Sequence, residues 1–136
     1  MSGGAMKRKS HILVVDDEPN VLVTYRLILQ QQGYEVSAAL SSQEARQSLM
    51  ERDIDLLLCD LSLERQENGF DVIDFARQRE PLLPTVLLTG YATPEAIERA
   101  EELGIPVLFK PIDINELLQT ISTLLKEHYE QHEAAG

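Results

Sequence analysis

Short runs of apolar residues alternate along the chain with segments in which apolar residues recur at helical spacing. Several of the runs are almost continuous and end abruptly at polar residues, which is typical of strands buried on both faces of a parallel sheet. The segment "YEVSAA" also reads as a strand. The pattern predicts five strands, at residues 11–17, 34–39, 54–61, 85–90 and 105–111.

Residues that favour the beginnings and ends of helices occupy the intervals between these strands. Pro19 suits a first helical turn, and Asn68-Gly69 is a strong turn signal before another helix. Ser41 and Thr93 are good N-terminal caps, and Asp113 precedes a long apolar stripe. Five helices are predicted: from Pro19 to Gly33, from Ser41 to Met50, after Gly69, from Thr93 to Gly104, and from Asp113 to about Tyr129.

Regular alternation of strands and helices predicts an α/β fold in which helices cover both faces of a parallel sheet. The expected architecture is a doubly wound, flavodoxin-like (βα)5 sandwich with strand order 2-1-3-4-5. We expect residues 11–128 to form this domain. The polar and basic residues 1–10 are predicted to be a disordered lead-in, and residues 129–136 a frayed tail.

The formal net charge of −11 narrows the classes of partner. Such a charge repels nucleic acids and anionic membranes, so direct DNA binding is not expected. No apolar run approaches the ~20 residues needed to cross a bilayer. The single cysteine, Cys59, excludes an internal disulfide and fits a reducing, cytoplasmic location.

Polar residues stand where the predicted strands end, and ligands of open α/β sheets bind beyond these carboxyl ends. Asp16 and Asp17 follow the first strand and Asp60 the third. With strand order 2-1-3-4-5 the first and third strands are neighbours, so the three carboxylates should share one pocket. Its rim should carry the residues at the ends of the fourth and fifth strands: Thr89 and Gly90, then Lys110 and Pro111.

Crowded carboxylates repel one another, and a hard divalent cation such as Mg²⁺ relieves the repulsion. An aspartate can itself be the nucleophile that forms an acyl phosphate, with a lysine and a hydroxyl contacting the phosphoryl group. Each residue taken alone has an ordinary explanation: acids favour a helix N-terminus, and Asp60 could be a turn residue. The joint order of acids, hydroxyl and lysine at separate strand ends favours a phosphoryl site.

The motifs "VVDDEP", "LLLCDLSL", "VLLTGYA" and "VLFKP" together resemble the receiver domains of two-component response regulators. The resemblance covers His11 to about His128. It implies that a protein of this kind takes a phosphoryl group from a phosphohistidine on a histidine kinase or a histidine phosphotransfer protein. A downstream protein partner or an output domain absent from these 136 residues would read the change. A homodimer is a further alternative.

The resemblance also implies roles for individual residues. Asp60 would be the phosphoacceptor, and Asp17 a Mg²⁺ ligand assisted by Asp16. Glu18 occupies the third acidic place with a lesser role, and the backbone carbonyl of Ser62 would be a further metal ligand. Lys110 would contact the phosphoryl oxygens, and the Lys110–Pro111 peptide bond would be cis. Thr89 would provide the switch hydroxyl.

Two departures from the family pattern affect how the signal is read. Three residues before the lysine the family usually has Tyr or Phe, and here Val107 stands. Phe109 is aromatic but lies one place before the lysine. The loop after Asp60 usually has Pro four residues on and Gly eight residues on; here Glu64 and Asn68 stand there, which suggests a one-residue insertion and a more mobile loop.

Three functions remain open from these residues. The leading one is a Mg²⁺-dependent phosphoaccepting receiver, which modifies only itself and is not an enzyme for another substrate. The second is a receiver-fold binding module with weak or atypical switching, as Val107 suggests. The third is an aspartyl-phosphate phosphatase, which typically has a second Asp where Ser62 stands and needs a cap domain.

Overall fold

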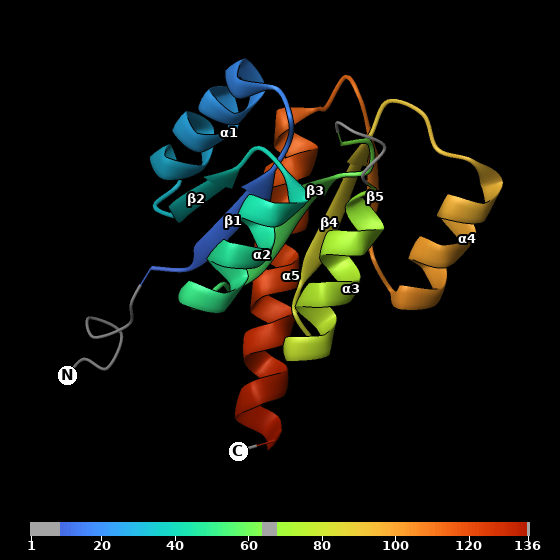
Figure 1. Ribbon diagram of the computed structural model, residues 1–136. Helices are drawn as coiled ribbons and strands as arrows, with labels where there is room; N and C mark the ends of the chain where they lie inside the picture. The colour runs from blue at the N-terminus through green and yellow to red at the C-terminus, as the bar shows by residue number, and fades with distance from the viewer. Residues whose placement is uncertain (1–8, 64–67, 136) are drawn as a thin grey trace.

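A computed structural model describes residues 9–63 and 68–135 (Figure 1). Its five parallel strands have the predicted order β2-β1-β3-β4-β5, so the doubly wound, flavodoxin-like fold is confirmed. The strands are β1 (His11–Val15), β2 (Glu35–Ala39), β3 (Leu56–Asp60), β4 (Thr85–Thr89) and β5 (Val107–Phe109). The helices are α1 (Pro19–Gln31), α2 (Ser42–Glu51), α3 (Gly69–Arg79), α4 (Pro94–Leu103) and α5 (Ile114–Ala135).

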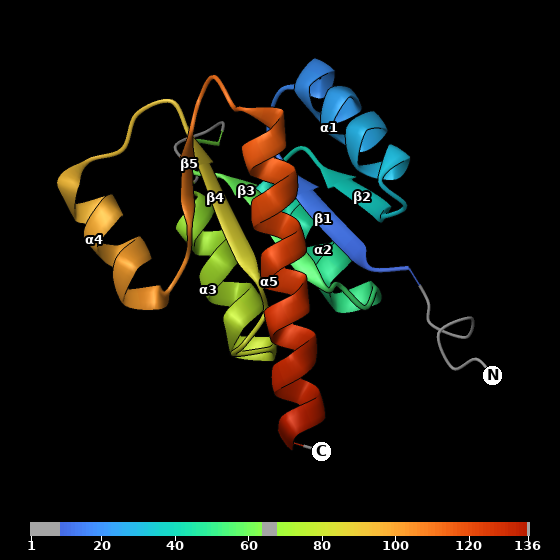
Figure 2. The same cartoon turned by 180° about the vertical axis from the view of Figure 1, so that it is seen from behind.

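The sheet divides the interior into two cores, because successive strand residues face opposite sides. Leu57 packs in a cluster with residues of α2 and α3, whereas the next residue, Leu58, packs with residues of α1 and α5. Figures 1 and 2 show these helix pairs on opposite faces of the sheet, and α4 beside β5. Burial on both faces explains why the strands are continuous apolar runs in the sequence.

The predicted caps set the beginnings of the helices. The Ser41 hydroxyl accepts a hydrogen bond from the Glu44 N–H at 3.2 Å, and the Glu44 carboxylate accepts one from the Leu40 N–H at 2.8 Å. The first bond satisfies a backbone donor that helix geometry leaves unpaired, and the second satisfies the N–H of the residue before the cap. Thr93 and Asp113 accept comparable bonds at the starts of α4 and α5.

The last strand is shorter than predicted. The sequence predicts a strand over 105–111, but β5 spans only Val107–Phe109. The N–H of Ile105 is used by the end of α4, where it donates to the Ala100 carbonyl at 2.9 Å. Pro106 has no N–H to donate, so the ladder with β4 begins one residue later.

The two ends of the chain differ in what the structure describes. The predicted lead-in, 1–10, falls mostly outside the described residues, which begin at Lys9. In the segment from Tyr129, where fraying is predicted, α5 continues to Ala135. Residues 129–135 contain Glu, Gln and Ala, which favour helix, and neither Pro nor Gly. Over the described residues, no helix combines the length and apolar character that a membrane span requires.

Candidate functional site

Three carboxylates converge at the carboxyl ends of β1 and β3, which are neighbouring strands. Asp16 and Asp17 directly follow β1, and Asp60 is the last residue of β3. One oxygen from each side chain lies within 4.8 Å of the others. Glu18 lies apart from this group: it is exposed, immediately precedes α1, and makes no side-chain capping bond.

Asp16 is held in a setting that disfavours its charge. Its side chain is 1% exposed, and one oxygen, Oδ1, accepts a hydrogen bond from the Glu18 N–H at 2.9 Å. The other oxygen, Oδ2, has no hydrogen-bond partner among the described residues. Burial raises the pKa of Asp16 from 3.8 to about 6; the Glu18 bond opposes this rise and the nearby Asp60 charge adds to it.

Lys110 connects the end of β5 to the acidic group. Its Nζ donates to Asp60 Oδ2 at 2.8 Å and lies 3.6 Å from Asp16 Oδ2. Burial acts to lower the pKa of Lys110, but the hydrogen bond to Asp60 and the charges of Asp60 and Asp16 raise it overall. The second oxygen of Asp60 accepts from the Ser62 N–H at 3.1 Å. The Lys110–Pro111 bond is cis.

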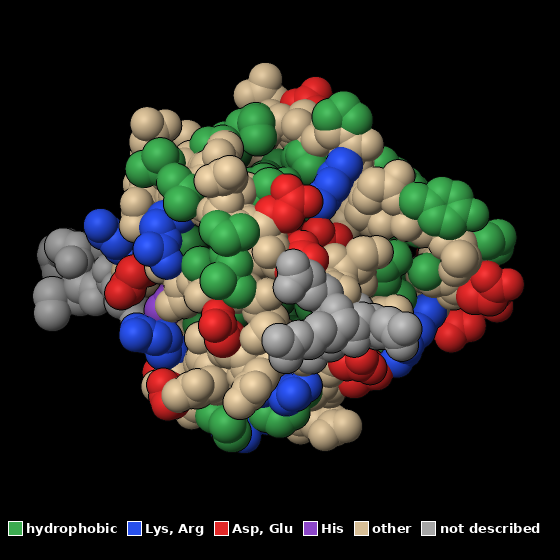
Figure 3. Space-filling view, turned by 45° about the horizontal axis from the view of Figure 1, so that its top comes forward, with side chains coloured by type: hydrophobic (Ala, Val, Ile, Leu, Met, Phe, Trp, Pro, Cys, Tyr) green, Lys and Arg blue, Asp and Glu red, His purple; other side chains and the backbone are tan. Residues whose placement is uncertain are grey.

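The donor set suits a hard divalent cation. Asp16, Asp17 and Asp60 supply oxygens only, and the buried Oδ2 of Asp16 lacks a hydrogen-bond donor among the described residues. Figure 3 shows acidic side chains gathered beside a basic one at this end of the molecule. The adjacent thiol of Cys59 is fully buried, and burial raises its pKa, so it does not supply a thiolate ligand.

Thr89 lies at the end of β4 with its hydroxyl engaged in the following loop. The hydroxyl donates to the Tyr91 carbonyl at 2.6 Å and accepts from the Tyr91 N–H at 3.1 Å. Thr89 is buried, whereas Gly90 and Tyr91 are exposed. These two bonds tie the conformation of the β4–α4 connection to the rotamer of one side chain.

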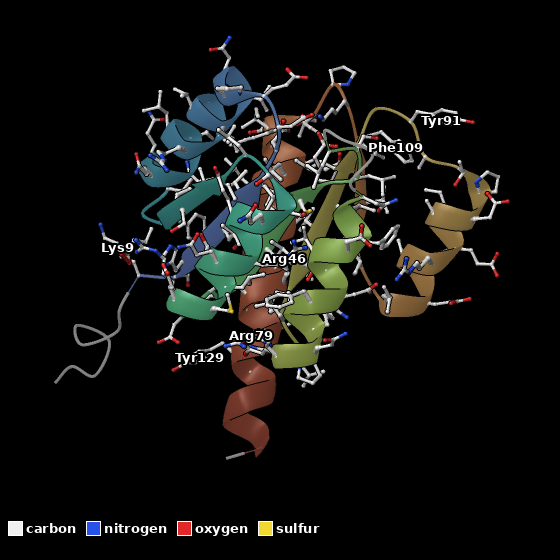
Figure 4. All side chains as sticks on the ribbon, viewed as in Figure 1. Lys9, Arg46, Arg79, Tyr91, Phe109 and Tyr129 are labelled. Atoms are coloured by element: carbon white, nitrogen blue, oxygen red, sulfur yellow. The ribbon has the colours of Figure 1, made fainter. Side chains whose placement is uncertain are left out.

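The place where the family usually has an aromatic residue is occupied differently here. Val107 is partly buried and packs against the cluster on the α2–α3 side of the sheet. Phe109 pairs with Thr89 in the ladder between β4 and β5, yet its side chain is 54% exposed. In the view of Figure 4, Phe109 and Tyr91 lie on the same side of the molecule.

Gly69 contacts the site in a way that sequence reasoning missed. A Cβ atom added there would lie 2.4 Å from the Asp60 carbonyl oxygen, so only glycine fits. The Asn68-Gly69 pair signalled a turn, but nothing in the local pattern indicated this close approach. The predicted insertion concerns residues 63–68, of which 64–67 lie outside the described part of the chain.

A family model described as "Response regulator receiver domain" matches residues 12–122 of the chain. This is the stretch that contains the acidic group, Thr89 and Lys110. The chain belongs to this family. Members of the family typically bind Mg²⁺, and receiver domains of response regulators interact with histidine kinases.

Curated relatives and solved structures agree with this assignment. The chain is 29% identical over 121 residues to the transcriptional regulatory protein GlrR of Escherichia coli, covering 88% of this chain and 27% of GlrR. It is 30% identical over 115 residues to the response regulator protein PilR of Pseudomonas aeruginosa, covering 84% of this chain and 26% of PilR. The chain thus spans about a quarter of the length of these relatives.

Among solved structures, a CheY-like receiver domain protein from Methanospirillum hungatei matches with a TM-score of 0.86 and 27% identity, over 91% of this chain and 99% of that one. The non-phosphorylated HemR receiver domain from Leptospira biflexa matches with a TM-score of 0.79 and 30% identity, over 86% and 94% of the two chains. The receiver fold therefore covers nearly all of this chain.

Proposed function

We propose that this receiver accepts a phosphoryl group on Asp60, with Mg²⁺ held by Asp16, Asp17 and Asp60. The donor would be a phosphohistidine on a histidine kinase or on a histidine phosphotransfer protein. The observation that carries the proposal is the meeting of three carboxylates with Lys110, whose ammonium group lies 2.8 Å from the Asp60 carboxylate.

The reaction is a transfer between two nucleophiles. A carboxylate oxygen of Asp60 attacks phosphorus, an oxygen–phosphorus bond forms, and the nitrogen–phosphorus bond breaks with its electron pair returning to the imidazole. Lys110 holds the Asp60 carboxylate in place before transfer, and its fixed positive charge is beside the phosphoryl oxygens afterwards. Hydrolysis of the acyl phosphate by water would restore Asp60.

Bound Mg²⁺ would neutralise charge on the carboxylates and on the transferred phosphoryl group. The backbone carbonyl of Ser62, two residues beyond Asp60, is proposed as a further ligand. Thr89 is proposed to report the transfer: its hydroxyl can donate to a phosphoryl oxygen only by giving up its bond to the Tyr91 carbonyl. Loss of that bond would release the β4–α4 connection.

Mg²⁺ is expected to stabilise the protein against thermal unfolding. At about ten times its dissociation constant, a ligand specific for the folded state adds about 1.4 kcal/mol to the free energy of unfolding. Asp17→Asn should reduce this gain strongly. Glu18→Gln, which alters the exposed neighbouring acid, is the matched control and should keep it. Equal stabilisation of wild type and Asp17→Asn in calorimetry would contradict the metal assignment.

Intact-mass spectrometry with a small-molecule phosphodonor tests the proposed reaction. Wild type is expected to gain one phosphoryl group in Mg²⁺ and little or none in excess EDTA. Asp60→Asn should gain none, because an amide cannot form the acyl phosphate. An undiminished adduct on Asp60→Asn, or no adduct on folded wild type, would exclude Asp60 as the acceptor.

A second function, a receiver-fold binding module with atypical switching, is favoured by Val107 and by the outward position of Phe109. In that case phosphorylation would change the pocket without reorganising the surface formed by α4 and β5. Amide chemical shifts of the phosphorylated and free protein distinguish the two. Changes confined to the strand ends support the module, and changes that spread over α4 and β5 support conventional switching.

Other aspects of the proposal follow from the family. The domain is proposed to span 11–128, to act in the cytoplasm, and to signal through a downstream protein partner or an attached output domain. Its net charge of −11 disfavours direct contact of this domain with nucleic acid. It is proposed not to be an enzyme for a diffusible phosphate ester, since Ser62 replaces the second aspartate that such phosphatases use.

A further inference from the structure

The first turn of α3 forms part of the backbone framework around Asp60. Gly69 lies against the Asp60 carbonyl with no room for a side chain. Its N–H donates to the Leu61 carbonyl at 2.7 Å, and the neighbouring Asn68 pairs with Ser62 in an isolated bridge. A displacement of this turn therefore moves the backbone at Asp60 and at the two residues that follow it.

The next residue of α3, Phe70, is in contact with Arg99 of α4. Phe70 is 3% exposed, and the guanidinium carbon of Arg99 lies 4.5 Å from the centre of its ring, within the range of a cation–π contact. Arg99 also forms an ion pair with Asp74, which stands four residues after Phe70 on the same face of α3. Arg99 of α4 thus contacts two residues of α3, Phe70 and Asp74.

A second arginine ties the far end of α4 to α3. Arg77 donates to the carbonyl of Leu103, the last residue of α4, at 2.9 Å, and to the carbonyl of Leu83 at 3.1 Å. Because α4 is fixed to α3 at two points, a shift of either helix is transmitted to the other. This connection does not involve Thr89 or the position of Val107.

We propose that Arg99 is a positioning residue for the Asp60 site. It acts through Phe70 and Gly69, and so couples the placement of α4 to the metal-binding and phosphoryl-accepting geometry. The inference rests on the proposed phosphorylation of Asp60. Coupling between two sites is reciprocal, so a partner that binds α4 would also alter the affinity of the site for Mg²⁺.

Amide spectra and Mg²⁺ titrations of the full chain test this coupling. Arg99→Ala is expected to shift the amide signals of Leu61, Ser62 and Gly69 and to weaken Mg²⁺ binding by about two- to thirtyfold, the range for residues that touch neither ligand. Phosphorylation by a small-molecule donor at limiting Mg²⁺ should slow by a similar factor. Asp74→Asn keeps the arginine over the ring and should give a smaller effect in the same direction.

Arg79→Ala is the matched control. Its guanidinium carbon lies 6.0 Å from the centre of the Phe75 ring, also on α3, but Figure 4 places Arg79 at the end of that helix away from the site. Arg79→Ala should leave the amide signals of Leu61, Ser62 and Gly69 and the Mg²⁺ affinity unchanged from wild type. Arg99→Lys, which keeps the charge, is available if a melting curve shows that Arg99→Ala is unfolded.

The two proposals fail in different ways. If folded Arg99→Ala keeps wild-type amide shifts at Leu61, Ser62 and Gly69 and wild-type Mg²⁺ affinity, the role of Arg99 is overturned, whatever the phosphorylation result. An effect of Arg79→Ala equal to that of Arg99→Ala would overturn it as well. If wild type accepts no phosphoryl group but Arg99→Ala still shifts those amides, the proposed function fails and the structural coupling stands.

Discussion

Asp16→Asn is expected to stabilise the metal-free protein near neutral pH, by about 1–3 kcal/mol. The Asp16 side chain is almost fully buried and one of its oxygens lacks a hydrogen-bond partner among the described residues, so its charge is costly in the folded state. An asparagine keeps an oxygen that can accept the Glu18 N–H bond and removes the charge beside Asp60. Urea unfolding in EDTA measures the difference.

The pKa of Asp16 determines at which pH values Asp16→Asn should stabilise the protein. The pKa of Asp16 is raised from 3.8 to about 6 on folding, so the folded state binds the proton more tightly than the unfolded state. The stabilisation from that proton is fully present below 3.8 and is lost as the pH rises through about 6. The advantage of Asp16→Asn should therefore appear above about pH 6 and vanish near pH 4.

Glu18→Gln removes an exposed carboxylate two residues away and serves as the control, with little change expected at either pH. An equal effect of Asp16→Asn at both pH values would show that charge burial is not its cause. The same variant should bind Mg²⁺ more weakly than wild type, because it loses a proposed ligand. Stability without metal and affinity for metal are thus expected to change in opposite directions.

Gly69→Ala is expected to have the second large effect, a loss of at least about 1–3 kcal/mol of stability together with weaker Mg²⁺ binding. The added methyl group would lie 2.4 Å from the Asp60 carbonyl oxygen, a backbone atom that cannot move without displacing the proposed phosphoacceptor. Denaturant unfolding measures the first effect and a Mg²⁺ titration the second.

Gly90→Ala is the steric control, because a Cβ at that position would have no atom within 4 Å. It should change the free energy of unfolding by no more than about 0.5 kcal/mol. If Gly69→Ala were equally mild, the first turn of α3 would not be packed against Asp60 as described. The proposed coupling of Arg99 to the site would then lack the contact between Gly69 and Asp60 on which it depends.

The general fold could be predicted from the sequence because the apolar runs and the helix caps act locally and agree with one another. Leu57 and Leu58 face opposite cores, and a run that is apolar at both positions requires a sheet covered on both sides. The ends of elements were less predictable. The start of β5 depends on Ile105 donating to the end of α4, a tertiary contact that no local pattern reveals.

The candidate site, too, could be predicted only in part from the sequence. Asp16, Asp17 and Asp60 meet because β1 and β3 are neighbours, as they are in the strand order of the family that the motifs resemble. Two other contacts depend on how α3 and α4 pack. These are the contact of Gly69 with the Asp60 carbonyl and the cation–π contact of Arg99 with Phe70. Helix packing of this kind is set by shape over many residues, so single-sequence periodicity does not contain it.

Mapping the modified residue tests the central claim most directly. Borohydride reduces an aspartyl phosphate to homoserine, so protein treated with a small-molecule phosphodonor and then reduced can be digested and sequenced by mass spectrometry. The account predicts homoserine at Asp60, formed with Mg²⁺ and absent in EDTA, with Asp16 and Asp17 unmodified. Homoserine at another residue, or none in folded wild type with Mg²⁺, would contradict it.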